Sequence, residues 1–551
     1  MNRRSAIWIL LALLASALAV YLIGNDRVQL WDRDEPRYAQ TSREMLQSGD
    51  WVVPRFLGEV RTAKPPLIYW AQASVMAVLG DNAFAARLPS ALAMIAVLTL
   101  LALVIGRAAG RERGVWTAFI FGSTVLAILA AKMSVTDAVL LLWIVIGQLC
   151  LYALWRTGPR GWLILLLGIS MGLGGLTKGP VAFGVHVTTL IALWLLNWRL
   201  EDLNPQGCRR LHWGLVFVGS VMVMSVVATP WLILIQQQEP TFLSHALGHD
   251  VVQRIQKGHE GHSGPPGYYV LAVWGTFFPW SLLIPAALVH GWRRRQDPKT
   301  RFALAALVGP WVMFELSVGK LPHYILPTYP ALAYLSADFL LRAADDLVTD
   351  LRSRSFKLIA RTMATLAVAG AVAGVGALLL HRPFYLINTI AIIVLLVLAA
   401  ATSWRVCALL LRHELRTAGL TIGIGMALLV ALAYGLLVPR LEPLRISQNT
   451  AKILADNDGY AAFGYMIDYK EPSLAFHQGG GLREHSDDNF LSNSTPQQWP
   501  EFVVLTERVW RSTAPELQKQ WNVIGRVRGL AYNERGGREI VVLKRKPVEF
   551  D

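Results

Sequence analysis

Long apolar runs separated by short polar connections fill the chain up to about residue 438. A helix needs about 20 consecutive apolar residues to cross a bilayer. The first run follows Asn2-Arg3-Arg4 and continues far enough to indicate a retained signal-anchor instead of a cleaved signal peptide. We predict thirteen transmembrane helices, at residues 6–24, 86–106, 114–131, 137–155, 161–177, 180–198, 213–235, 268–290, 302–319, 324–342, 358–380, 384–403 and 417–437.

The pattern changes after residue 438, where the apolar runs shorten and Asp, Glu, Asn, Gly and Gln become frequent. The shorter runs predict strands at 501–506 and 538–543 and helices at 447–455 and 514–520. The predicted fold class is therefore an all-α polytopic membrane domain at 1–438, followed by a small α/β domain at 439–551. The second part has an ordinary domain size.

Composition agrees with a membrane protein. The chain is 54% hydrophobic and only 16% charged, whereas a soluble protein carries about 25% charged residues. The formal net charge of +15 does not indicate a nucleic-acid partner, because the sequence has no basic stripe and no nucleic-acid-binding motif. Cys150, Cys208 and Cys407 are far apart in the sequence, so we expect neither a disulfide framework nor a zinc motif from them.

The number of basic residues differs between the connections on the two sides of the membrane. Lysines and arginines crowd the short connections on the side of the N-terminus, as in the connection with Arg107, Arg111 and Arg113. The positive-inside rule therefore places the N-terminus in the cytoplasm, and thirteen spans place the C-terminus outside. The connection 25–85 and the tail are then periplasmic in a bacterial inner membrane. The short outer connections carry only six basic residues, Lys132, Lys178, Arg254, Lys257, Lys320 and Arg382.

The first outer connection contains two predicted helices. Asp34 and Glu35 precede or enter a helix at Pro36, where negative charge is favourable, and Gly49 ends that helix. The second helix runs from Pro65-Pro66 to Gly80 and is too short to cross a bilayer. We expect interfacial helices that frame a cleft open to lipid.

Charged groups also mark the outer ends of the later spans, at Asp137, Lys178 and Lys320. An ionisable residue at the edge of a membrane is costly and is usually paired or functional. Each of these residues also has a structural interpretation that stays open. In that interpretation Asp34-Glu35 serves as a helix cap without chemistry, Asp137 pairs with Lys132, and Lys64 is a snorkelling cation.

Several motifs resemble one enzyme family, in order, along the whole membrane part. The first outer connection carries Asp34-Glu35-Pro36-Arg37-Tyr38-Ala39, Arg43-Glu44-Met45, Gly49-Asp50-Trp51, Pro54, Lys64-Pro65-Pro66-Leu67 and Tyr69-Trp70. Later motifs are Leu176-Thr177-Lys178-Gly179-Pro180 and Lys320-Leu321-Pro322-His323-Tyr324-Ile325-Leu326-Pro327. With these motifs the chain resembles the lipid A aminoarabinose transferases, which belong to the GT-C superfamily of polyprenyl-phosphate-dependent glycosyltransferases.

The resemblance implies an enzyme of the bacterial inner membrane. Such an enzyme moves 4-amino-4-deoxy-L-arabinose from undecaprenyl phosphate to phosphate groups of lipid A at the periplasmic face, and so confers resistance to polymyxin. The partners implied are the lipid-linked aminosugar donor, the lipid A acceptor and the surrounding membrane lipid, with no nucleic acid.

The resemblance also implies roles for residues. Asp34 matches the family's loop carboxylate, Asp137 matches the second outer acidic residue, and Glu35 shares the motif of Asp34. The expected substrate-binding residues, in the same motifs and groups, are Lys64, Arg37, Tyr38, Tyr324, Lys178, Lys320 and His323.

The implied chemistry suits these residues. The leaving group is a lipid phosphate, so cations fixed beside its developing charge are a large catalytic contribution. Lys64 and Arg37 are suitable, and the planar fork of Arg37 matches phosphate oxygens. Because a phosphate acceptor is already anionic, we expect Asp34 to orient and stabilise charge more than to abstract a proton.

The sequence indicates no certain cofactor. His245 and His249 are spaced i, i+4 and His262 follows in the same outer connection, but they form no closed metal signature. Solvated histidines are the favoured interpretation, and a divalent metal site and substrate contacts stay open.

Two rival functions remain. A related polyprenyl-phosphate-sugar transferase, such as a protein O-mannosyltransferase, shares the paired carboxylates, although the Pro36-Arg37-Tyr38-Ala39 and Lys64-Pro65-Pro66-Leu67 segments favour aminoarabinose transfer. A lipid transporter or flippase is less favoured. Transporters place ionisable residues near the bilayer midplane and have repeated halves, whereas this chain carries few such residues inside its spans, Glu315 being an exception.

Overall fold

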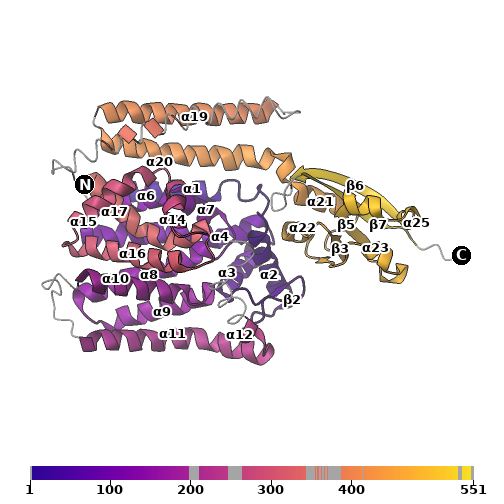
Figure 1. Ribbon diagram of the computed structural model, residues 1–551, viewed down its shortest axis with the longest axis horizontal. Helices are drawn as coiled ribbons and strands as arrows, with labels where there is room; N and C mark the ends of the chain where they lie inside the picture. The colour runs from indigo at the N-terminus through magenta and orange to yellow at the C-terminus, as the bar shows by residue number, and fades with distance from the viewer. Residues whose placement is uncertain are drawn as a thin grey trace. The chain divides into compact units, whose positions relative to one another are not determined.

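The computed structural model describes residues 3–197, 210–245, 264–342, 386–412, 414–530 and 537–547, with seven isolated positions between 354 and 369 (Figure 1). The chain divides into two compact units. The helical unit comprises Met1–Ile23, Thr62–Ile68 and Arg87–Gly435, and the mixed unit comprises Gly24–Arg61, Tyr69–Ala86 and Leu436–Asp551. The predicted division into domains at residues 438 and 439 stays a prediction.

Helices make up nearly all of the described helical unit. Seven helices are long and apolar enough to cross a membrane, or eight if the bent pair α6 and α7 is one span, counted over the described residues. Together with the small sheet of the mixed unit, this confirms a mainly helical polytopic fold. The elements are α1 (Arg3–Leu22), α4 (Ala83–Leu100), η1 (Leu101–Ile105), α5 (Gly106–Ala109), α6 (Arg111–Gly122), α7 (Val125–Lys132), α8 (Asp137–Thr157), α9 (Gly161–Lys178), α10 (Val181–Asn197), α11 (Arg210–Gln238), α12 (Phe242–His245), α14 (Tyr268–Thr276), η3 (Ser281–Leu283), α15 (Ile284–Arg293), α16 (Pro298–Leu316), η4 (Pro322–Thr328), α17 (Tyr329–Leu341), α19 (Leu386–Leu411), α20 (Leu415–Leu432) and η5 (Ala433–Leu437).

Several of the thirteen predicted spans are interrupted in the structure. The predicted span 114–131 is bent by 69° between α6 and α7. The predicted span 268–290 breaks into α14 and α15 around Pro279, where the missing backbone N–H prevents a continuous helix. The predicted span 324–342 begins within the 3₁₀ helix η4, which contains Pro327. The predicted span 358–380 lies almost entirely outside the described residues.

Small residues let α9 approach α11 closely. A Cβ atom added at Gly168 would lie 2.5 Å from Val223, and one added at Gly172 would lie 2.7 Å from Val227. Two glycines four residues apart form the small-residue stripe that allows close helix packing in membranes. This stripe packs the middle of α9 against α11 and so helps to position the helix that ends in Lys178.

Lys132 fixes the end of the first helix. Its ammonium group donates to the carbonyls of Val20 at 3.1 Å, Tyr21 at 3.4 Å and Ile23 at 2.7 Å. A cation at the C-terminal end of a helix satisfies carbonyls that have no partner inside the helix. The pairing of Lys132 with Asp137, considered above as an alternative, is not formed between these two described residues.

The sheet of the mixed unit has five strands in the order β4-β3-β5-β7-β6. β3 is parallel to β4 and β5, and β7 is antiparallel to β5 and β6. The predicted strands at 501–506 and 538–543 are confirmed as β5 and β7, and the predicted helices as α21 and α25. The bounds are β3 (Gly464–Ile467), β4 (Leu482–Glu484), β5 (Phe502–Thr506), β6 (Trp521–Leu530), β7 (Gly537–Arg545), α21 (Ile446–Ala455), α22 (Pro472–Gln478), α23 (Phe490–Asn493), η8 (Pro496–Gln498), α24 (Glu507–Ser512) and α25 (Pro515–Gln518).

Both faces of this sheet are covered, because successive strand residues point to opposite sides. Val504 and Val542 pack with Leu454 of α21 in one apolar core. Val503 and Leu543 belong to a second core, whose other members include Phe490, Leu491, Trp499, Trp510 and Trp521. The result is a three-layer α/β arrangement.

The first outer connection contributes the other elements of the mixed unit. The predicted helix ending at Gly49 is confirmed as α2 (Asp34–Ser48), and Gly49 takes the left-handed conformation with φ of 71°. The second predicted helix is confirmed as α3 (Leu67–Leu79), which ends at Gly80 with φ of 82°. Glycine adopts this conformation without steric cost. A short antiparallel pair, β1 (Arg55–Phe56) and β2 (Glu59–Val60), lies between the two helices in sequence.

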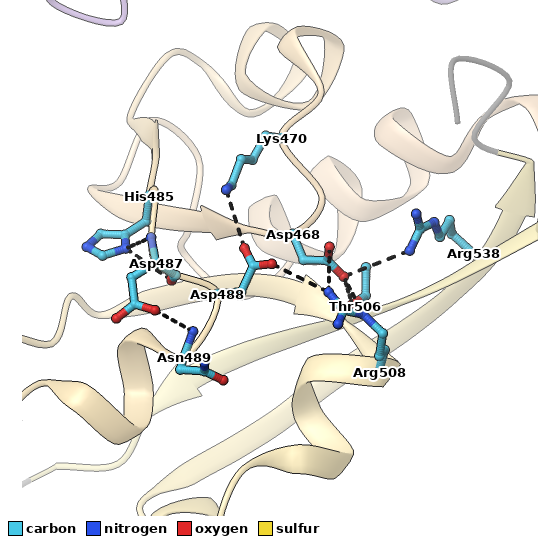
Figure 2. Close-up of polar contacts among 9 residues, drawn as sticks. All are labelled: Asp468, Lys470, His485, Asp487, Asp488, Asn489, Thr506, Arg508 and Arg538. Atoms are coloured by element: carbon cyan, nitrogen blue, oxygen red, sulfur yellow. Dashed lines mark hydrogen bonds and ion pairs between the residues drawn. The ribbon is translucent and has the colours of Figure 1, made fainter. Parts of the chain in front are cut away.

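An ion-pair network lies at the end of β3, as Figure 2 shows. The Asp468 carboxylate accepts a hydrogen bond from the Thr506 hydroxyl and lies 3.0 Å from Arg508 and 3.9 Å from Arg538. Partial burial alone raises the pKa of Asp468, but the contacts from Arg508, Thr506 and Arg538 outweigh burial and hold the pKa below its ordinary value. Asp488 extends the network, because it lies 3.4 Å from both Lys470 and Arg508.

This depressed pKa predicts an acid-sensitive sheet. The stabilisation from ionised Asp468 is present above the unfolded pKa of about 3.9 and is lost as the pH falls through the lower folded value. We expect Asp468→Asn to lower the melting temperature of the purified chain at pH 7 and to reduce the difference between the melting temperatures at pH 7 and pH 3.5. Scanning fluorimetry measures both. Asp456→Asn, at an exposed position of the same unit, is the control, and an equal effect there contradicts the assignment.

Candidate active site

Asp137 lies in an ion-paired group in the helical unit. It is the first residue of α8, and its Oδ1 lies 2.7 Å from Nζ of Lys178, the last residue of α9. Nε2 of His323, in η4, lies 3.9 Å from Oδ2 of the same carboxylate. The carboxylate stands at the N-terminus of one helix and the ammonium at the C-terminus of the next, so the helix dipoles favour both charges.

Two further predicted site residues belong to this group. The Lys178 ammonium lies 5.0 Å from the centre of the Tyr324 ring, within cation–π range. The charge of Lys64 acts on the Asp137 carboxylate, as those of Lys178 and His323 do. We call Asp137, Lys178, His323, Tyr324 and Lys64 the Asp137 cluster. The structure thus brings Asp137, Lys178, His323 and Tyr324 into one group, and Lys64 acts on Asp137 through its charge.

The Asp137 cluster is suited to an anion. It combines two lysines and a histidine with one carboxylate, so its net charge is positive. The side chains of Asp137 and Lys178 are only 12% and 15% exposed, whereas His323 is 32% exposed. Charges act more strongly on one another where they are partly removed from water. An anionic group that reached His323 would therefore meet a concentrated positive field.

Lys320, also predicted to bind substrate, has a different partner. Its ammonium donates to the Gly264 carbonyl at 3.0 Å, and the residue is buried. This contact ties the segment before α14 to the segment before η4. The structure therefore gives Lys320 a bond that holds the backbone beside His323 and Tyr324.

The adjacent carboxylates Asp34 and Glu35 lie in the mixed unit and have different surroundings. Glu35 is fully buried, and its Oε2 accepts a hydrogen bond from the Trp31 N–H at 2.9 Å. Asp34 is exposed in the first turn of α2. The buried carboxylate therefore fixes the turn before the helix, while the exposed one is available to a ligand.

Arg61 and Tyr69 complete the surroundings of Asp34, and the sequence motifs did not single out Arg61. The Arg61 guanidinium donates to the Tyr69 hydroxyl at 3.1 Å and lies 5.6 Å from the centre of the Tyr38 ring. Burial lowers the pKa of Arg61, but Tyr69, Tyr38 and Asp34 outweigh burial and raise it. Its position three residues before Lys64 was the signal that could have identified it. Arg37, which follows in α2, acts electrostatically on Glu484.

Contacts from distant sequence hold α2 in place within the mixed unit. Asp32 accepts hydrogen bonds from the backbone N–H of Ser473 at 2.8 Å and from the Ser473 hydroxyl. Arg43 donates to the Phe476 carbonyl at 2.7 Å and lies 4.0 Å from the centre of the Phe476 ring. Arg43 also forms an ion pair with Asp81. The bonds of Asp32 to Ser473 and of Arg43 to Phe476 connect residues more than 400 positions apart, so sequence periodicity gives no sign of them.

The predicted histidine candidates for a metal stay a prediction. His249 and His262 lie outside the described residues, and only the backbone of His245, at the end of α12, is described. Within the described residues, no group of three or more His, Cys, Asp or Glu side chains is arranged to hold a metal ion.

Known proteins resemble the chain in sequence. Residues 6–245 match the family described as dolichyl-phosphate-mannose-protein mannosyltransferase. The undecaprenyl phosphate-alpha-4-amino-4-deoxy-L-arabinose arabinosyl transferase of Serratia proteamaculans is 36% identical over 358 residues, which are 64% of this chain and 61% of that protein. The protein of the same name from Aeromonas hydrophila is 33% identical over 349 residues, which are 62% and 61% of the two chains. The chain is a homologue of these arabinosyl transferases. The resemblance drawn from the motifs is thereby confirmed.

The sequence similarity covers only part of each relative. The chain spans about three-fifths of the length of the curated relatives that it matches. A solved structure shares the fold more completely. The crystal structure of ArnT from Cupriavidus metallidurans bound to undecaprenyl phosphate has a TM-score of 0.78 to this chain, with 24% sequence identity and 97% of each chain covered.

The ion pair within the Asp137 cluster yields a first prediction about activity. Lys178→Gln removes the cation beside the partly buried Asp137 carboxylate. In an assay of the sugar transfer for which the relatives are named, we expect the rate to fall about 100-fold, the effect of losing one fixed charge-stabilising group. Lys178→Arg should recover part of the rate because it restores the positive charge. The transfer product is measured by mass spectrometry in membranes.

Lys452→Gln is the matched control, because Lys452 is exposed on α21. Unchanged transfer by Lys178→Gln at normal expression would remove Lys178 from the site.

The contacts of Asp32 yield a second prediction. Asp32→Ala leaves the Ser473 donors without their acceptor, and we expect a loss of stability on the order of 1–3 kcal/mol. Hydrogen–deuterium exchange should rise together in α2 and α22, although these helices are far apart in sequence. Asp26→Ala is the control, since Asp26 is 61% exposed and forms an ion pair with the exposed neighbouring Arg27. A rise confined to α2 would contradict the coupling.

Proposed function

We propose that this protein transfers 4-amino-4-deoxy-L-arabinose from undecaprenyl phosphate to phosphate groups of lipid A. The observation that carries the proposal is the 36% identity, over 358 residues, to a transferase named for this donor and this sugar. The fold shared with ArnT supports it. The positive Asp137 cluster supports it further, because a lipid-linked phosphate is the anion that such a site would bind.

The proposed reaction is a single displacement at the anomeric carbon of the sugar. An oxygen of the lipid A phosphate forms the new bond to that carbon as the bond to the undecaprenyl phosphate oxygen breaks. The electron pair of the broken bond leaves with undecaprenyl phosphate. The nucleophile is already ionised, so this step requires no strong general base.

Within the Asp137 cluster, we assign the phosphate of the donor to Lys178 and Lys64. Their ammonium groups stabilise the negative charge that develops on the leaving phosphate. Asp137 holds Lys178 in position through the 2.7 Å ion pair. Tyr324 and His323 line the same group and are assigned to the donor as well.

We assign Asp34 to the amino sugar. An exposed carboxylate can pair with the sugar's ammonium group and stabilise positive charge that develops at the anomeric carbon. Arg37, Tyr38 and Arg61 are its proposed companions in substrate binding. Glu35 is assigned a positioning role, because its carboxylate is buried and accepts the Trp31 N–H.

The proposed location is the bacterial inner membrane, with the Asp137 cluster and the mixed unit on the periplasmic side. The charge asymmetry of the connections supports this orientation. Addition of an amine to lipid A lowers its negative charge, so the expected consequence is resistance to polymyxin and similar cationic peptides.

A related transferase is the second candidate function. The match of residues 6–245 to the dolichyl-phosphate-mannose-protein mannosyltransferases favours it. Such an enzyme would use a hydroxyl acceptor and would need a general base. Transport of a lipid is less favoured, because the charged residues of the Asp137 cluster stand at the ends of helices.

One experiment separates these functions. The chain is expressed in a strain that lacks its own aminoarabinose transferase but makes the donor, and lipid A is analysed by mass spectrometry. We expect a mass increment of one aminopentose and restored growth on polymyxin. Lipid A of unchanged mass, with the chain present in the membrane, would overturn the proposal. Addition of EDTA to an assay in membranes tests whether a divalent metal takes part.

A further inference from the structure

A second site is indicated within the helical unit, away from the Asp137 cluster. An apolar cavity of about 110 Å³, partly open to the surroundings, lies between η1, α5, α8, α16 and α17. Its walls include Leu101, Ile105, Ile144, Phe302 and Ala306. Such a lining suits a hydrocarbon chain and offers little to a polar ligand.

The cavity lies deeper along α8 than Asp137. Ile144 and Tyr152 line it, and they follow Asp137 by 7 and 15 residues, or about 10 and 22 Å at the usual helical rise. One wall is the π-helix η1, whose wider turn is a feature found frequently at functional sites. The cavity therefore extends toward the end of the spans opposite to the Asp137 cluster.

Positive charge gathers at that far end. Lys299, at the start of α16, lines the cavity. Arg156, one turn beyond Tyr152 on α8, acts electrostatically on Tyr152. Nη1 of Arg156 is buried and has no hydrogen-bond partner in the described structure, and the same holds for Nε of Arg294 in the turn before α16. A buried cationic N–H group without an acceptor is costly.

Among the described residues, the neighbouring acidic group is already used elsewhere. Asp297 also acts on Tyr152, but its carboxylate accepts the Lys299 backbone N–H at 3.0 Å and lies 3.7 Å from Arg342. Arg301, which is fully buried, uses its N–H groups on Asn197 and on the carbonyls of Arg295 and Gln296. Within the described residues, Lys299, which lines the cavity, and Arg156, one turn beyond its Tyr152 wall, thus carry positive charge that no carboxylate contact balances.

We propose that this cavity holds part of an acyl chain of an anionic phospholipid, whose phosphate binds Lys299 and Arg156. Basic pockets between transmembrane helices are recognised binding sites for such headgroups. Undecaprenyl phosphate fits the charge pattern less well, because the proposed donor phosphate lies at the opposite end of α8. The bound phospholipid would brace α8, and with it Asp137, from the other leaflet. The binding itself does not depend on the proposed reaction.

Native mass spectrometry of the purified full chain tests the site. We expect retention of one phosphatidylglycerol molecule per chain, under conditions that remove phosphatidylethanolamine. The double variant Lys299→Gln, Arg156→Gln should retain phosphatidylglycerol at least fivefold less. Ala306→Phe, which fills the cavity without a change of charge, should have the same effect. Arg160→Gln is the control, because Arg160 is exposed just beyond the same end of α8.

Three results would overturn the proposed phospholipid site. Equal retention of the two phospholipids, or retention unchanged in both the charge variant and the cavity variant, overturns the site and indicates lipid at the general protein surface. Displacement of phosphatidylglycerol by undecaprenyl phosphate assigns the cavity to the donor instead and also overturns the proposal. Melting temperatures close to that of the wild-type chain establish that the variants are folded. Because no sugar donor or lipid A is present, failure here leaves the proposed transfer reaction to its own test.

Discussion

The ion pair between Asp137 and Lys178 is the interaction on which the candidate site depends. A single carboxylate at the edge of a membrane is costly, and so is a single ammonium group. At 2.7 Å each charge offsets the free-energy cost of removing the other from water. The ion pair also joins the start of α8 to the end of α9. His323 and Tyr324 then gather around a pair whose position is already fixed. The glycine stripe of α9 supports the same arrangement, because it fixes the helix that carries Lys178.

A second constraint operates in the mixed unit. α2 carries few apolar residues, so burial of its own surface gives it limited stability. Its place is set instead by directed bonds, from Ser473 to Asp32 and from Arg43 to Phe476. Directed bonds fix orientation more narrowly than apolar contact does. The exposed carboxylate of Asp34 therefore projects from a helix whose start is held by Glu35 and whose centre is held by Arg43.

Asp34 and Glu35 are adjacent in one motif, but their different positions in the structure give them different roles. In sequence Asp34 and Glu35 are equivalent acids at a helix start. In the structure one accepts a backbone hydrogen bond inside the unit, and the other faces outward. A similar division separates Lys178 from Lys320: the first pairs with a carboxylate in the cluster, and the second binds a backbone carbonyl. The role of a lysine in such a motif therefore depends on which acceptor the fold places beside its ammonium group.

The sequence by itself determined the membrane character, the two helices of the first outer connection and the strands β5 and β7, because each depends on local pattern. Gly49 and Gly80 end their helices whatever lies around them. Local pattern could not identify the interrupted spans, since one or two helix-breaking residues change the mean hydropathy of a long apolar run only slightly. It also missed β3 and β4, which are too short to show a period.

Only the tertiary structure decided which charges meet. The partner of Asp137 is Lys178, 41 residues away, and not Lys132, five residues away, because α9 returns antiparallel to α8. The partner of Asp32 lies 441 residues away. Electrostatic pairing depends on distance in space, and distance in space is fixed by helix packing that no local pattern contains.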